Sequence, residues 1–168
     1  MGWPQVGDFE VAIRDTAIER KRRMNNSGTG ITKKDEIIEA ASTLFSLKGY
    51  KATTVAEISN RANLHKTSLF HYFKNKEDTL MAVMDKSLNK HLNILNKIVK
   101  DPTLSGEEKL KLALEKQISA TCKYRDHINV YLSEIKSLSP ENRKKYTRKR
   151  KEFETCYQYI IKLKFHRF

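Results

Sequence analysis

The side chains that could do chemistry favour binding over catalysis. Only two cysteines occur, Cys122 and Cys156, and neither belongs to a CxxC pair or a Cys/His cluster. His71 has no second metal ligand three or four residues further on, and the neighbouring acids Glu107 and Glu108 are typical of a helix N-terminus. The 168 residues contain no GxSxG, HExxH or phosphate-binding loop motif. The sequence therefore predicts no catalytic residues, no metal and no cofactor, in a protein that is not an enzyme.

The charge of the chain indicates what kind of partner it binds. The formal net charge is +13, and a surplus this large favours a polyanionic partner. Most of this positive charge lies in residues 106–168, which contain sixteen Lys and Arg and eight Asp and Glu. The densest run of basic residues is over 143–151. That run is open to three interpretations: a solvated helix face, a surface that attracts an anionic effector, or a surface that attracts DNA non-specifically.

A short segment between Thr54 and Phe73 has the spacing of a helix-turn-helix. Two helices are expected, over 54–62 and 66–73, joined at Asn63 and Leu64. Asn63 tolerates the left-handed backbone that a sharp turn between helices needs, and Leu64 can fill the space between them. In DNA-binding proteins with this motif the second helix enters the major groove. The pattern alone also fits two helices that only pack against each other.

The rest of the chain is expected to form helices that position this segment. A polar residue followed three positions later by an acid marks helix starts at Thr32, Thr54, Asn75 and Ser105. Stops are expected at Lys48-Gly49 and at Asp101-Pro102, and Ser139-Pro140 opens the last helix. Apolar stripes follow helical spacing, including Leu80, Met84, Leu88, Leu92, Leu95 and Val99, and then Leu110, Leu114 and Ile118. No run alternates long enough for a strand, so the predicted fold class is all-α.

Two stretches of sequence resemble one family. Residues 41–58, ASTLFSLKGYKATTVAEI, and residues 64–78, LHKTSLFHYFKNKED, are similar to the opening of the TetR family of bacterial transcriptional regulators. The resemblance covers about residues 32 to 90. It implies a flexible extension over 1–30, a three-helix DNA-binding domain over 31–91, and a helical regulatory domain for ligand binding and dimerisation over 92–168.

The resemblance also implies roles for individual residues. Lys66, Thr67 and Ser68 would face base edges, and Phe70 takes a place where the family often has Tyr. The residues expected to hold DNA phosphates are Thr54, His71, Tyr72 and Lys76. Two positions depart from the family pattern: Asn63 replaces the usual Gly of the turn, and His65 replaces the Ser that usually caps the recognition helix.

The function implied is a ligand-responsive repressor that binds double-stranded operator DNA in the cytoplasm as a homodimer, with no membrane partner. A small-molecule inducer is expected, hydrophobic or acyl-CoA-like, because residues 131–135 and Arg143 are weakly similar to members that control lipid metabolism. The alternative is a basic helical protein that binds membranes or partners non-specifically, with a purely structural helix-turn-helix.

Two expectations concern the ends of the chain. Relative to the family pattern, two interface helices after the one starting at Pro140 are absent before Phe168, which predicts a shortened body and a weak or altered dimer. Met24 lies at the usual distance before the first helix, which suggests it as the translation start.

Overall fold

The computed structural model describes residues 32–165, and every regular element in that range is helical. The predicted all-α fold class is confirmed for this part of the chain. The 1–30 extension and the suggested start at Met24 lie outside the described residues. In chain order the elements are α2 (Lys33–Ala52), α3 (Val55–Arg61), α4 (Lys66–Leu69), α5 (Lys76–Lys100), α6 (Gly106–Lys123), α7 (Arg125–Glu134), the 3-10 helix η1 (Ile135–Ser137) and α8 (Pro140–Phe165).

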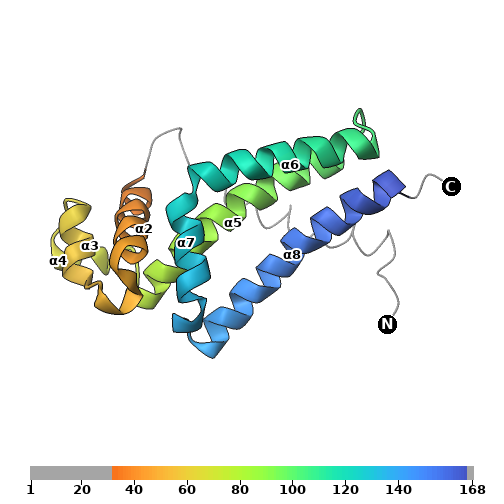
Figure 1. Cartoon of the computed structure of the whole chain (residues 1–168). Coiled ribbons are helices and arrows are strands. Elements are labelled where there is room, and N and C mark those ends of the chain that lie inside the picture. The colour runs from red at the N-terminus through yellow and green to blue at the C-terminus, as the bar shows by residue number, and fades with distance from the viewer. Residues whose placement is uncertain (1–31, 166–168) are drawn as a thin grey trace.

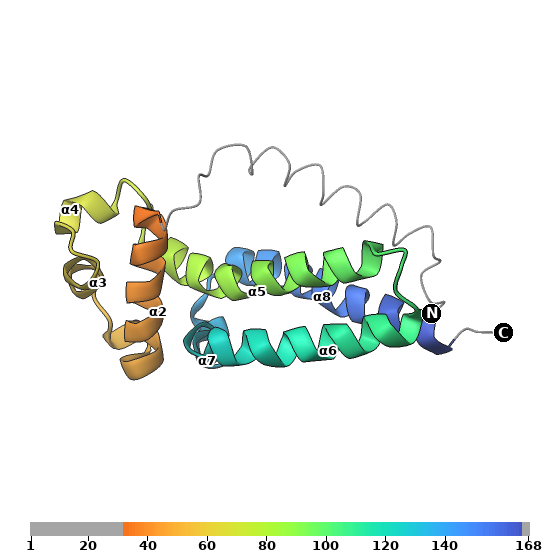
Figure 2. The same cartoon turned by 90° about the horizontal axis from the view of Figure 1, so that it is seen from above.

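Figure 1 shows an elongated molecule with α2, α3 and α4 at one end and α6 and α8 extending to the other. We call α2–α4 the head and α6–α8 the body. The long helix α5 connects them, beginning beside the head and running alongside α6 and α8 (Figure 2). The domain boundary predicted between residues 91 and 92 falls inside α5 and stays a prediction.

Local hydrogen bonds start the head helices where the sequence predicts them. Thr32 accepts from the Asp35 amide at 3.1 Å and Thr54 accepts from the Glu57 amide at 3.2 Å, and each acid reaches back to its cap residue. The stop predicted at Lys48-Gly49 is a kink: Gly49 has φ 83°, ψ 161°, and the helix resumes to Ala52. Only glycine adopts such a backbone readily.

The turn between α3 and α4 has the expected backbone. Asn63 has φ 52°, in the left-handed region, and the Leu64 amide donates to the Ser59 carbonyl at 2.9 Å. Leu69 and Phe73 are buried beneath the turn. The predicted helix over 66–73 is too long, because α4 ends at Leu69. Beyond it, Phe70, His71 and Tyr72 donate to carbonyls three residues back, which is the tighter 3-10 pattern.

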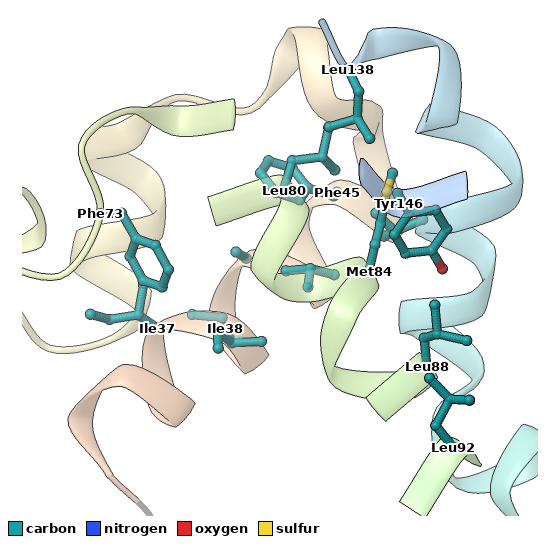
Figure 3. Packing of buried hydrophobic residues seen from close by; sticks show 14 of the residues in the cluster. Ile37, Ile38, Phe45, Phe73, Leu80, Met84, Leu88, Leu92, Leu138 and Tyr146 are labelled. Carbon is teal, nitrogen blue, oxygen red and sulfur yellow. The ribbon is translucent and has the colours of Figure 1, made fainter. Parts of the chain in front are cut away.

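A continuous core joins the head to the body. Ile37 and Phe45 of α2 lie in one buried cluster with Leu80 and Met84 of α5 and with Leu138 before α8 (Figure 3). The whole stripe predicted for α5, from Leu80 to Val99, is buried. The head is therefore packed against α5 and the body through a shared core.

The stripe predicted for α6 is wrong in its last two members. Leu114 and Ile118 are 49% and 67% exposed, whereas Ala113 and Ala120 are buried. The helix α8 comes close to α6, since a Cβ added to Gly106 would lie 2.5 Å from the Leu163 carbonyl and the Tyr157 hydroxyl donates to the Ala113 carbonyl at 3.2 Å. Small side chains fit that contact, and the larger apolar ones turn outward.

Candidate nucleic-acid interface

The side chains predicted to face DNA lie on the exposed side of the helix-turn-helix. Lys66 and Thr67 are exposed at the first turn of α4, and Ser68 is half-buried. Phe70 and Tyr72 are 49% and 40% exposed, and His71 is exposed beside them. Leu69 and Phe73, between and behind these residues, are buried and anchor the segment. The helix α4, which carries Lys66, Thr67 and Ser68, lies at the end of the molecule opposite the far ends of α6 and α8 (Figure 1).

Thr54 is exposed at the start of α3, but its polar groups serve the helix cap. Its amide and its hydroxyl each donate to Glu57 Oε2 at 2.8 Å. Glu57 also pairs with Lys48, and this pair, with the bonds from Thr54, lowers the pKa of the Glu57 carboxyl to about 2. The predicted phosphate contact of Thr54 stays a prediction. The cap bonds of α3 fix the position of this residue.

His65 has a role that sequence reasoning did not assign. As expected of a poorer cap than Ser, it makes no side-chain bond to the amides of α4. Its Nδ1 instead lies 2.9 Å from the Thr67 hydroxyl. That contact holds the side chain of Thr67 at the exposed end of the recognition helix.

Lys76 is held by the protein. Its ammonium donates to the carbonyls of Tyr50 and Thr53, at 2.9 Å each, and lies 4.2 Å from the centroid of the Tyr50 ring. The side chain thereby ties the start of α5 to the last turn of α2 and to Thr53 just after it. The predicted phosphate contact is not tested by this arrangement, but the ammonium already has two acceptors.

Polar and charged groups join the head to α5 and to α7. Lys86 of α5 donates to Asp35 and pairs with Glu39, both on α2, at 2.9 Å. The hydrogen bond from Thr32, followed by that from Lys86, lowers the pKa of Asp35 to about 2. The imidazole of His127 on α7 lies 3.4 Å from Glu39, and burial lowers its pKa, so the ring is neutral near pH 7. Nothing in the local sequence pattern indicates these contacts.

Glu134 makes a second connection from α7. Its Oε1 accepts from the Tyr50 amide at 3.0 Å, next to the kink at Gly49, and its Oε2 accepts from the Ser137 hydroxyl at 2.6 Å. The end of α7 is therefore hydrogen-bonded to the segment that leads into the helix-turn-helix.

The body contains a pocket of about 190 Å³ between α5, α6, α7 and α8. Its polar lining includes His91 and Arg150, and Tyr131, Phe153 and Ile128 are among its apolar neighbours. The described residues contain no group of His, Cys, Asp and Glu side chains that could hold a metal ion. Within the same range, no helix is long and apolar enough to cross a membrane.

Two segments of the chain match known protein families. Residues 37–83 match the family model of bacterial regulatory proteins of the tetR family, and residues 103–163 match a tetracyclin repressor-like C-terminal domain. Among solved structures, the TetR family transcriptional regulator PfmR from Thermus thermophilus is 30% identical, with a TM-score of 0.68 over 75% of this chain and 68% of that one. AibR, solved with isovaleryl coenzyme A and operator DNA, is 23% identical and has a TM-score of 0.66 over 77% and 70% of the two chains, a likeness of fold.

Curated relatives are similar over shorter stretches. The negative regulator IcaR of the biofilm operon in Staphylococcus epidermidis is 40% identical over 62 residues, which are 37% of this chain and 34% of IcaR. The repressor KstR2 of Mycolicibacterium smegmatis is 32% identical over 108 residues, which are 64% of this chain and 52% of KstR2. The uncharacterized regulator YerO of Bacillus subtilis is 33% identical over 112 residues, 66% of this chain and 38% of YerO. The chain thus spans about a third to a half of these relatives.

Proposed function

The chain belongs to the tetR family of bacterial regulatory proteins, and from that premise we propose that it is a repressor that binds operator DNA through residues 54–73. The observation that carries the proposal is the arrangement of α4. Lys66 and Thr67 are exposed at its first turn, while Leu69 and Phe73 are buried and fix its orientation. A helix presented in this way can place its first residues against base edges in the major groove.

The exposed groups divide into two kinds of contact. Lys66 can donate to guanine acceptors, and the methyl group of Thr67 can meet the methyl group of thymine. Phe70 adds an exposed apolar ring. His71 and Tyr72, beside α4, can donate to phosphate oxygens, which fixes the position of the protein without reading the sequence. The protein acts in the cytoplasm, where its operator lies.

A small effector in the body pocket would control the affinity of the head for DNA. The helix α7 is suited to transmit this signal, because Ile128 and Tyr131 line the pocket while His127 and Glu134 contact the head. A ligand that moves α7 would displace Glu134 from the Tyr50 amide. Coupling then requires only that the ligand binds the two positions of α7 with different affinity.

The proposed reading role of Lys66 can be tested on a site selected from random DNA. Lys66→Ala should cost about 1–3 kcal/mol of binding free energy and relax the preference at one base pair. The matched control is Lys111→Ala, which removes another exposed lysine, from α6 in the body. Equal losses on the selected site and on random DNA would show that Lys66 contributes only charge.

A further inference from the structure

Arg150 lines the body pocket with most of its hydrogen-bonding capacity unused. Its guanidinium carbon lies 5.2 Å from the ring centroids of both Tyr131 and Phe153. Among the described residues, Arg150 pairs with Glu154, which lies one turn further along α8, at a distance of 4.0 Å. The Glu154 side chain is more than half exposed. A guanidinium has five N–H donors in a planar fork that matches a carboxylate. Contacts with aromatic rings leave those donors available at its edge.

His91 lines the same pocket and carries a buried acceptor atom. The residue is 6% exposed, and its Nδ1 lies 2.7 Å from the Ser87 carbonyl oxygen. Because a carbonyl can only accept, Nδ1 carries the proton of that bond. Burial lowers the pKa of His91, which keeps the ring neutral and leaves a lone pair on Nε2. Nε2 is buried and has no hydrogen-bond partner among residues 32–165. A buried acceptor of this kind is satisfied by a hydroxyl or N–H donor.

The volume of the pocket limits the size of its ligand. An apolar cavity of about 150 Å³ holds one benzene molecule. The pocket of about 190 Å³ therefore has room for a single ring with one or two small polar substituents. Aromatic side chains suit such a ring, and Phe153 has its ring 5.3 Å from Tyr157 and 6.1 Å from His91.

We propose that this pocket binds a small hydroxylated aromatic acid, whose carboxylate pairs with Arg150 and whose hydroxyl donates to His91 Nε2. The basic run on α8 supports the choice of an anion. Arg143, Lys144, Lys145, Arg148 and Lys151 are exposed on the helix that carries Arg150, and such a field raises the local concentration of anions. Control of operator binding by this ligand rests on the proposed function, whereas its binding does not.

Calorimetry on the full chain without DNA tests the ligand class. The probes are the three monohydroxybenzoates, benzoate, and the three hydroxybenzyl alcohols, which keep the ring and the phenol but lack the negative charge. At least one hydroxybenzoate should bind about tenfold or more tightly than its alcohol, as expected for a charge-assisted hydrogen bond. It should also bind several-fold more tightly than benzoate. Absence of hydroxybenzoate binding, or equal affinity for acid and alcohol, would overturn the proposal in the unmodified protein.

Two variants assign the contacts. Arg150→Met should abolish the preference for acid over alcohol, whereas Arg148→Met, which removes an exposed arginine from the same helix, should preserve it. His91→Phe should abolish the preference for hydroxybenzoate over benzoate while benzoate still binds. If Arg150→Met or His91→Phe kept the preference of the unmodified protein, that result would contradict the assignment.

The outcomes also separate the ligand class from the proposed function. If the acid binds but leaves operator affinity unchanged, the proposed release mechanism fails and the ligand class stands. If no operator exists but the acid binds, the proposed function fails alone.

Discussion

Lys76 positions the segment that leads into the helix-turn-helix through contacts within the protein. Its ammonium bridges the carbonyls of Tyr50 and Thr53, which lie on either side of the end of α2. Thr54, the cap of α3, follows directly. The path of the chain into the helix-turn-helix is therefore fixed from the first residue of α5.

This role predicts a loss of stability when Lys76 is changed. Lys76→Met removes two hydrogen bonds from a charged donor, and we expect it to lower the free energy of unfolding by about 2–3 kcal/mol. Lys74→Met, at an exposed position two residues earlier, should change stability by less than about 0.5 kcal/mol. Denaturant unfolding measures both values. A stable Lys76→Met protein that loses only one unit of the salt dependence of DNA binding would instead favour a direct phosphate contact.

Asp35 predicts a pH dependence with a defined sign. Its carboxyl accepts bonds from Thr32 and Lys86, which lower its pKa from 3.8 to about 2 in the folded protein. A lowered pKa contributes stability that is complete above the unfolded value and is lost as the pH falls through the folded one. Asp35→Asn should therefore be less stable than the unmodified protein at pH 7, and the difference should shrink between pH 4 and pH 2. Glu115→Gln, at an exposed site on α6, controls for the loss of one carboxylate. A constant difference down to pH 2 would contradict this account.

At the scale of the elements, the sequence predicts what short-range bonds determine. The caps at Thr32, Thr54 and Ser105 and the left-handed Asn63 depend on neighbours within a turn or two, and all are found in the structure. The buried stripe of α5 is also found, because its apolar residues recur at helical spacing in the sequence. The connections that involve Lys76 and Glu134 could not be predicted, since each joins residues 23 or more positions apart. The outward face of α6 depends on the approach of α8, which periodicity does not reveal.

The contact between α7 and the head predicts a local effect on dynamics. Glu134→Ala removes the acceptor of the Tyr50 amide, and a bond to a charged acceptor is worth about 1.5–3 kcal/mol. We expect amide hydrogen exchange at Tyr50 to accelerate about tenfold or more. Glu115→Ala serves as the control, because Glu115 is exposed on α6, away from this junction. Unchanged exchange at Tyr50 would mean that α7 does not restrain the head, and would remove the proposed route from pocket to DNA.

At the scale of the whole molecule, the described part of the chain presents one helix-turn-helix. A regulator with a single head reads a short site, whereas two heads related by a twofold axis read two half-sites about one helical turn apart. The described helices leave apolar side chains available for association, with Leu114 and Ile118 exposed on α6 and Ile161 and Phe165 on α8. Dimerisation stays a prediction. If the protein binds DNA as a symmetric dimer, we expect its preferred site to be a palindrome.

Selection of binding sites from random duplex DNA, followed by affinity measurement at physiological salt, tests the central claim most directly. The account predicts an enriched palindrome with half-sites about one turn apart, bound about a thousandfold or more tightly than random DNA. Binding that depends on salt alone, with no enriched sequence, would contradict it. That result would instead indicate a basic helical protein whose helix-turn-helix serves only to pack.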